Sequence, residues 1–172
     1  MSTSSGSSGE KSPEIRLQPI GVVRTNASQD EIRDRKAGTL FRVEIFPQYE
    51  EALDGLEGFS HILVLAYLNQ LRPEQIGHLK VKPRGLLRYG LSLDELPLMG
   101  VFALDSPSRP NPIGLSVARL LRRDGSTLTV SDLDFFDNTP VLDIKPYQSS
   151  YRPEAFKLPD WHERLLKKAG HV

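Results

Sequence analysis

The chain has 172 residues, 22 Lys and Arg against 22 Asp and Glu, and 38% hydrophobic residues. This composition is typical of one globular domain and argues against wholesale disorder, collagen-like structure and coiled coils. With no Cys, disulfides, thiolate metal sites, Fe–S clusters and a Cys nucleophile are excluded, and a cytoplasmic location is favoured. The zero net charge argues against a broadly basic nucleic-acid coat, although a local basic patch could still bind phosphates.

Residues 1–13 are rich in Ser and Gly and contain no apolar run, so we expect a flexible tail there rather than a signal peptide. The longest apolar run, residues 62–68, is the length of a strand and far shorter than the roughly 18 residues of a membrane span. We expect a barrel domain over residues 14–150, a C-terminal extension with a short helix over residues 151–172, and no membrane association.

Short apolar segments separated by Gly, Pro and Asp dominate the chain from residue 15 onward. Phe41, Val43 and Ile45 alternate with charged residues, which predicts a half-buried strand. Further strands, about eight in all, are predicted at residues 20–23, 62–68, 79–81, 100–103, 115–121, 127–130 and 141–144.

Two segments have helical patterns. Pro47 followed by apolar residues at helical spacing predicts one helix that ends at Gly55 or Gly58. Residues 159–168 predict the other, with basic residues in the last turn. Many short strands and few helices predict a mainly β fold, a closed or nearly closed β-barrel, because closure removes exposed strand edges.

Familiar cofactor and metal motifs are missing from the sequence. It contains no GxGxxG, GxxxxGK[ST], HExxH or GxSxG pattern, and its four His show no metal-ligand spacing. Four Asp lie within residues 132–143, but without the spacing of a calcium-binding EF-hand. We therefore expect no metal ion, no Rossmann cofactor site and no P-loop.

A proline-rich loop, Ser106-Pro-Ser-Arg-Pro-Asn-Pro-Ile-Gly114, carries the most distinctive polar residues. Its three prolines, Pro107, Pro110 and Pro112, restrict the backbone before any ligand arrives. Arg109 and Asn111 would lose little entropy on binding a polar ligand from such a loop. The alternative is a rigid connector that only fixes a chain crossing.

Polar residues also gather near the strand predicted at 141–144. Strand periodicity puts Val141, Asp143 and Lys145 on one face, with Leu142 and Ile144 on the other. The carboxylate and ammonium would then share one space. A surface ion pair of little energetic value is the alternative.

Other polar side chains suit a heterocycle or a phosphate. Asn69 and Gln70 follow an apolar strand and can donate and accept hydrogen bonds, whereas His61 at its start is expected to be structural. Two basic clusters suit RNA, unless they are only solvated faces. The clusters are Arg33, Arg35 and Lys36, and Lys80, Lys82, Arg84 and Arg88.

Several motifs together resemble the TsaA-like (TrmO-type) tRNA methyltransferases over about residues 17–148. The motifs are GVFA at 100–103, SPSRPNPIGLS at 106–116, DNTPVLDIKPY at 137–147, IGVVR at 20–24 and LEGFSH at 56–61. The chain departs from the family pattern where Arg usually precedes the proline loop, since Asp105 stands there. Asn69 replaces a usual His, and Asn138 a usual Gly.

The resemblance implies an S-adenosylmethionine-dependent enzyme on a β-barrel, active as a homodimer with the cofactor near the subunit interface. It implies tRNA as the substrate, methylated on N6 of N6-threonylcarbamoyladenosine beside the anticodon. By motif position, the implied cofactor contacts are Asn69, Gln70, Leu115, Ser131, Asp132, Leu133 and Asp134.

The expected catalytic set comprises Arg109 and Asn111, which would hold the modified nucleotide, and three residues that would organise the pocket. These three are Asp137, Asp143 and Lys145, with either Asp as a candidate proton acceptor. Two alternatives remain: a cofactor-binding module without tRNA methyltransferase activity, and a non-catalytic RNA-binding barrel.

Overall fold

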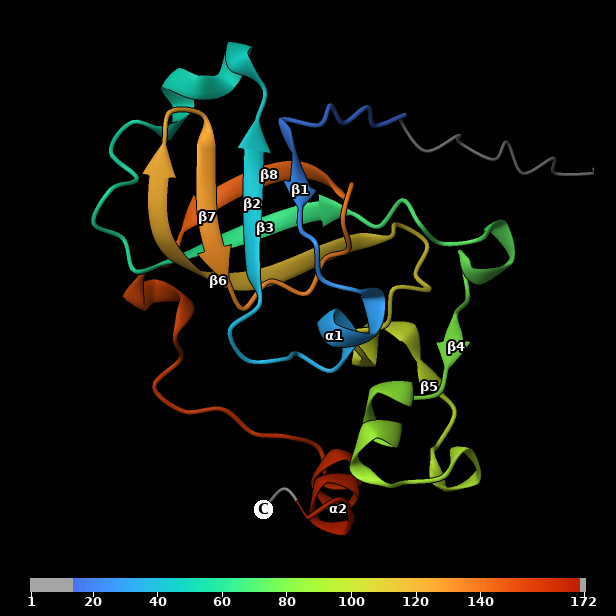
Figure 1. Cartoon of the computed structure of the whole chain (residues 1–172). Helices are drawn as coiled ribbons and strands as arrows, with labels where there is room; N and C mark the ends of the chain where they lie inside the picture. Colours follow the sequence, from blue (N-terminus) through green and yellow to red (C-terminus); the bar gives the residue numbers. More distant parts are fainter. Residues whose placement is uncertain (1–13, 171–172) are drawn as a thin grey trace, which may run out of the picture.

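The computed structural model describes residues 14–170, so the predicted tail at 1–13 lies outside the described residues. Six strands form a closed antiparallel barrel in the spatial order β1-β2-β7-β6-β3-β8 (Figure 1). These strands are β1 (Gly21–Arg24), β2 (Leu40–Ile45), β3 (His61–Tyr67), β6 (Ile113–Asp124), β7 (Thr127–Ser131) and β8 (Pro140–Pro146). The predicted mainly β, closed barrel is confirmed.

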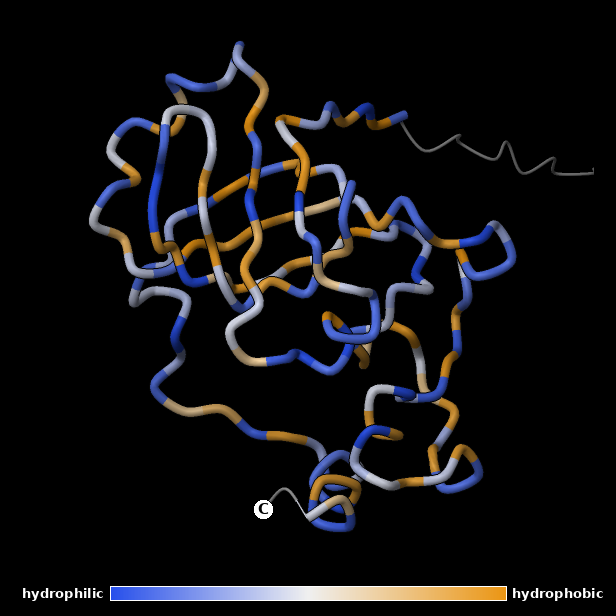
Figure 2. The backbone as a smooth tube through the Cα atoms, viewed as in Figure 1, coloured by the Kyte–Doolittle hydropathy of each residue, from blue (hydrophilic) through white to orange (hydrophobic). Residues whose placement is uncertain are grey.

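Alternating side chains fill the barrel. In β2, Phe41, Val43 and Ile45 are buried, and Phe41 lies opposite Val130 of β7. The tube in Figure 2 alternates between hydrophobic and hydrophilic colours along this strand. The period of two explains why a strand with two charged residues still belongs to a barrel wall.

The helices differ in part from their predictions. Residues Pro47–Leu53 form a 3₁₀ helix, which ends before Gly55. Helix α2 (Asp160–Lys168) begins one residue after the predicted start. Helix α1 (Gln29–Arg33), between β1 and β2, was not predicted; five residues are too few for a periodic pattern.

The segment between β3 and β6 leaves the barrel and builds a small second unit. Its two-stranded sheet pairs β4 (Lys80–Val81) with β5 (Met99–Gly100). The predicted strand at 100–103 is therefore wrong beyond Gly100. Val101 donates its N–H to the Leu79 carbonyl at 2.9 Å, and a 3₁₀ turn over Val101–Ala103 follows.

Helix α2 packs on this second unit, below the barrel in Figure 1. A small apolar cluster joins them, made of Leu86, Leu91, Leu96 and Leu165 with Tyr89, Trp161, Leu166 and Ala169 around it. The C-terminal helix therefore fixes the loop-rich segment rather than extending the barrel.

A β-bulge changes the faces of β8. Leu65 of β3 lies opposite Asp143, but the next residue, Ala66, lies opposite Val141, so Leu142 is the extra residue. Val141 and Ile144 consequently face the core. The prediction that Val141 shares a face with Asp143 and Lys145 is wrong, because simple periodicity does not anticipate a bulge.

Candidate functional site

A cavity of about 600 Å³, here called the main cavity, lies at one end of the barrel. It is bordered by the segment after β3, the start of β6, the β7–β8 loop and the proline-rich loop. The predicted site residues that line it are Asn69, Gln70, Arg109, Leu115 and Asp134. The structure thus brings together residues that are up to 65 positions apart in the sequence.

The main cavity has an apolar wall. Its large apolar residues are Leu68, Leu71, Ile113, Leu115, Val117, Phe135 and Phe136. Phe135 is buried and packs against the bare backbone of Gly114, where an added Cβ would lie only 2.5 Å from the ring atom Cε1. Gly114 therefore permits a close approach that shapes this wall.

Asp134 lines the main cavity beside Phe135, and one of its carboxylate oxygens lacks a hydrogen-bond partner among the described residues. Its Oδ2 accepts a hydrogen bond from Arg35 Nη2 at 3.0 Å, whereas its buried Oδ1 has no partner among the described residues. A buried acceptor without a donor is costly, so a ligand donor at this position would be stabilising.

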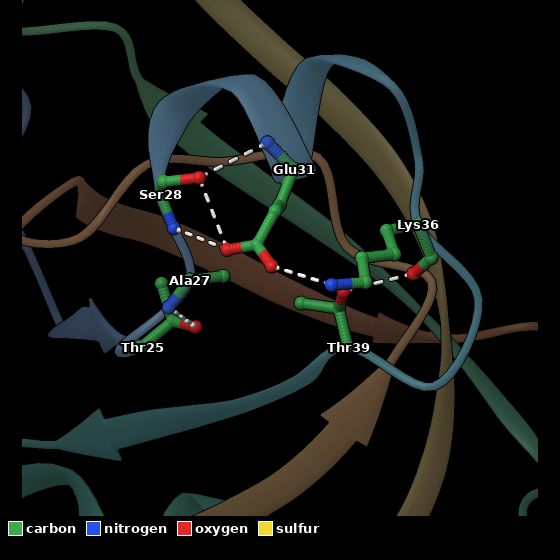
Figure 3. Close-up of polar contacts among 6 residues, drawn as sticks. All are labelled: Thr25, Ala27, Ser28, Glu31, Lys36 and Thr39. Carbon is green, nitrogen blue, oxygen red and sulfur yellow. Dashed lines mark hydrogen bonds and ion pairs between the residues drawn. The ribbon is translucent and has the colours of Figure 1, made fainter.

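Helix α1 begins with a capping box between Ser28 and Glu31 (Figure 3). The loop that follows this helix carries Arg35. Ser28 Oγ accepts from the Glu31 backbone N–H, and Glu31 Oε2 accepts from the Ser28 N–H at 3.0 Å. Lys36 Nζ donates to Glu31 Oε1 at 2.7 Å, and this bond, with those from Ser28, lowers the pKa of Glu31 to about 2. Arg35 itself adopts a positive φ of 50°.

Asn69 and Gln70 fasten the β7–β8 loop. The Asn69 side-chain amide donates to the Asn138 carbonyl at 3.3 Å, and that of Gln70 donates to the Asp137 carbonyl at 2.6 Å. The Asp137 carboxylate accepts from the Thr25 N–H at 3.0 Å and from the Asn138 side chain at 2.6 Å. Asp137 lies in this network rather than on the cavity wall.

The proline-rich loop forms the wall opposite the barrel. Half-buried Arg109 donates from Nη1 to the carbonyls of Leu104 and Ser106, both at 3.4 Å. Asp105 and Arg109 place opposite charges on this wall. Asn111 is exposed and outside the set of residues that line the cavity.

Asp143 and Lys145 lie on the outer face of β8, away from the main cavity lining. Their side chains form an ion pair at 2.7 Å and are about half exposed. The hydrogen bond and charge of Asp143 raise the pKa of Lys145. The position matches the alternative of a surface pair, and a role for either residue in the reaction stays a prediction.

Three predicted cofactor contacts occupy the end of β7 and the loop after it. Ser131 Oγ donates to Asp132 Oδ2 at 2.8 Å, and Leu133 is buried in the barrel core. Asp132 and Leu133 line a smaller cavity of about 90 Å³ beside Arg35. Arg35 borders both cavities, so this set neighbours the main cavity without lining it.

The two basic clusters differ in their surroundings. In the first, Arg33 pairs with Asp30 at 3.0 Å and lies over the Phe136 ring, so it supports the main cavity wall. The second cluster, Lys80, Lys82, Arg84 and Arg88, lines a separate cavity of about 1060 Å³, here called the basic cavity.

Residues 14–170 contain no group of three or more His, Asp or Glu arranged to hold a metal ion. No helix within that range is long and apolar enough to cross a membrane.

Sequence reasoning missed the aromatic wall and the use of Arg35. The adjacent Phe135 and Phe136 were a usable signal, because they follow directly on the predicted contact Asp134. Arg35 was expected only as part of a basic cluster that suits RNA. Its ion pair with Asp134 joins residues 99 positions apart, so no local pattern indicates it. The Ser28-x-x-Glu31 pattern was the signal for α1.

Comparison with known proteins gives the family. The model of the tRNA-methyltransferase O N-terminal domain matches residues 28–152. A probable S-adenosyl-L-methionine-binding protein of Methanothermobacter thermautotrophicus is 42% identical over 78% of this chain and 90% of the relative. One of Archaeoglobus fulgidus is 38% identical over 92% of this chain, but the chain spans only 44% of that relative.

A mouse tRNA (adenine(37)-N6)-methyltransferase is 38% identical over 74% of this chain and 28% of its own length. A crystal structure of TrmO superposes with a TM-score of 0.66 at 31% identity, covering 86% of this chain and 64% of that one. TrmO from Pseudomonas aeruginosa gives a TM-score of 0.63 at 29% identity over 85% of this chain and 61% of that one. The chain belongs to the tRNA-methyltransferase O family, of which it carries the N-terminal, barrel-type domain.

Proposed function

We propose that the chain binds S-adenosylmethionine in the main cavity and methylates N6 of an adenosine in tRNA, specifically N6-threonylcarbamoyladenosine beside the anticodon. The observation that carries this proposal is the main cavity within a domain of this family. It joins an apolar wall, Arg109 and an Asp134 oxygen that has no partner among residues 14–170.

The residues that line the main cavity fit the cofactor chemically. The apolar side chains suit an adenine ring, and the unpaired Asp134 Oδ1 would accept from a hydroxyl or ammonium group. Arg35 would provide a cation for the carboxylate of the cofactor. When bound, this cofactor supplies a methyl group on a positively charged sulfur that leaves as a neutral thioether.

The contribution of the chain to methyl transfer would be alignment. Arg109 borders the main cavity on one side and the basic cavity on the other, so its guanidinium could hold a carboxylate or phosphate of the substrate between them. The substrate nitrogen loses a proton as it gains the methyl group, and Asp105 and Asp134 are the carboxylates that line the main cavity. A neutral leaving group requires no acid on the cofactor side.

We also propose that the active form is a homodimer. The outer face of β3 and β6 exposes Tyr67, Leu115, Val117 and Leu121, an apolar group of the kind that marks interfaces. Leu115 and Val117 belong to both this face and the main cavity. A second copy seated there would cover the cavity mouth and could add residues to it.

Calorimetric titration of S-adenosylmethionine, followed by incubation with tRNA and mass analysis of the nucleosides, tests the proposal. We expect cofactor binding and a methylated threonylcarbamoyladenosine. Cofactor binding without methyl transfer would support the module alternative. Binding of tRNA without cofactor binding would support the non-catalytic RNA-binding barrel.

A further inference from the structure

The basic cavity combines uncompensated positive charge with an exposed aromatic ring. Its lining contains six Lys and Arg side chains but only one acid, Asp105. Arg72 pairs with Glu74 at 2.9 Å, whereas Lys80 and Arg84 form no ion pair within residues 14–170. Lys82 donates to the Leu93 carbonyl, a neutral group that leaves its charge uncancelled. Such a hollow attracts anions more strongly than a flat surface does.

Phe102 contributes the aromatic surface of the basic cavity. It follows β5 in the 3₁₀ turn that replaces the predicted strand, and 78% of its surface is exposed. No other aromatic ring stacks on it within the described part of the chain. An exposed phenyl ring beside lysines is the arrangement that stacks unpaired bases while cations contact the phosphates.

Helix α2 supplies a further polar group. His162 lines the basic cavity, and its Nδ1 atom is buried without a hydrogen-bond partner among residues 14–170. The cavity also shares one wall with the main cavity, the loop from Asp105 to Arg109 except Ser108. A polymer that lies in the basic cavity is therefore next to the main cavity.

We propose that the basic cavity is a subsite for a nucleotide adjacent to the methylated one. The base stacks on Phe102, and Lys80 and Arg84 contact the phosphates of single-stranded RNA. This inference rests on the proposed function, since it assumes that the acceptor nucleotide enters the main cavity across the shared wall. A single-stranded loop suits the site, because its bases are free to stack on side chains.

The test compares Phe102→Ala with Phe156→Ala, whose ring is 76% exposed in the segment before α2 and lies outside the basic cavity lining. Fluorescence anisotropy with labelled tRNA and with a single-stranded oligouridine measures binding. We expect Phe102→Ala to weaken both by about tenfold or more, Phe102→Tyr to restore them, and Phe156→Ala to leave them unchanged. Equal affinities of the two Ala variants would overturn the stacking role.

The phosphate contacts are tested with the double variant Lys80→Ala and Arg84→Ala. The control is the double variant Arg152→Ala and Lys157→Ala, since these two residues are outside the lining of the basic cavity. The first pair should reduce the salt dependence of oligouridine binding by about 0.7 units of logarithmic slope per contact, and the control pair should not. Identical slopes would overturn the phosphate role.

Measuring tRNA binding and methyl transfer separately distinguishes this inference from the proposed function. If Phe102→Ala weakens tRNA binding but the wild-type protein transfers no methyl group, the proposed function fails and the subsite stands. If it methylates tRNA while Phe102→Ala behaves like Phe156→Ala, the subsite fails and the function stands. Absence of RNA binding by the wild-type protein would overturn the subsite.

Discussion

The contact between Gly114 and Phe135 determines the shape of the main cavity at the scale of single residues. We expect Gly114→Ala to displace the buried Phe135 ring, because the new Cβ would lie 2.5 Å from Cε1. Overpacking of this kind costs about 1–3 kcal/mol, which lowers the melting temperature by roughly 2–10 °C. Cofactor affinity should fall as the wall moves.

Gly85→Ala is the matched control, since no atom of residues 14–170 lies within 4 Å of the added Cβ there and its φ lies outside the left-handed region. Adding Phe135→Leu to Gly114→Ala should recover part of the stability, a coupling expected only for residues in contact. Calorimetric unfolding and cofactor titration measure both effects. Additive changes in the double variant would show that the two residues act separately.

Asp105 provides a prediction about charge. Its carboxylate borders the main cavity, whereas the cofactor carries a positive sulfur that its demethylated product lacks. If the carboxylate and the sulfur lie about 8 Å apart in a largely aqueous dielectric, their attraction is on the order of 0.5–1 kcal/mol. We expect Asp105→Asn to lower the affinity for S-adenosylmethionine about two- to fivefold and to leave the affinity for the product unchanged.

Titration calorimetry with both compounds measures this difference. Ser108→Ala on the same loop is the control, because Ser108 lies outside the main cavity lining. A parallel loss of affinity for cofactor and product in Asp105→Asn would instead indicate that Asp105 organises the loop.

Residues that line the main cavity were predictable where a motif marked them. They were not predictable where a local irregularity of the strand changed the direction of the side chains. Arg109 and Asp134, which the motifs marked, line the main cavity, and their roles stay predictions. Asp143 and Lys145 do not line it, because one extra residue in β8 turns them outward. The β-bulge in β8 depends on how this strand pairs with β3, and no local pattern in residues 140–146 predicts it.

Helix α2 is the element whose attachment we expect to depend on pH. Lys168 Nζ lies 2.5 Å from Glu95 Oε1, and this bond, with those from Ser92, lowers the pKa of Glu95 to about 2 from 4.5. A lowered pKa in the folded state stabilises the attachment above about pH 4.5. That contribution is lost as the pH falls from 4.5 towards 2.

We expect Glu95→Gln to weaken the attachment of α2 at pH 7, and the difference from wild type to shrink as the pH falls from 4.5 and to vanish below about pH 2. Trp161, the only Trp, belongs to the cluster between α2 and the second unit, so its fluorescence reports the attachment. Glu163→Gln, an exposed change on α2 itself, should have no effect. A difference that persists unchanged to pH 2 would exclude the Lys168 contact as its cause.

Elements were predictable in proportion to their length and regularity. The alternation in β2 and the basic last turn of α2 gave correct positions. The 3₁₀ form of Pro47–Leu53 was not predictable, since 3₁₀ and α segments this short share the same apolar spacing. The two-residue strands β4 and β5 depend on each other over about 20 residues and carry too little pattern to be delimited.

At the scale of the whole molecule, barrel closure followed from the number of short strands, whereas the second unit did not. Its apolar cluster joins Leu86, Leu91 and Leu96 to Leu165, and such long-range packing leaves no local periodicity. The proposed nucleotide subsite depends on this packing, since the second unit forms the basic cavity that adjoins the main cavity.

Dimerisation is the prediction that concerns the entire molecule. Leu121 lies on the outer face of β6, 46% exposed, and is not among the residues that line the main cavity. A buried, unpaired carboxylate at an interface is strongly destabilising, so we expect Leu121→Glu to produce a folded monomer. Leu40→Glu on β2, at 56% exposure on another strand of the barrel, should remain dimeric.

Light scattering at micromolar concentration measures the mass, and cofactor titration of each variant measures the site. If the partner copy completes the main cavity through Leu115 and Val117, the monomeric variant should bind S-adenosylmethionine at least tenfold more weakly while its melting temperature stays near that of Leu40→Glu. A monomeric wild-type protein with full cofactor affinity would contradict the homodimer. A monomeric Leu121→Glu variant with unchanged affinity would leave the dimer in place but show that each chain builds its cofactor site alone, because no residue from the partner would then be needed.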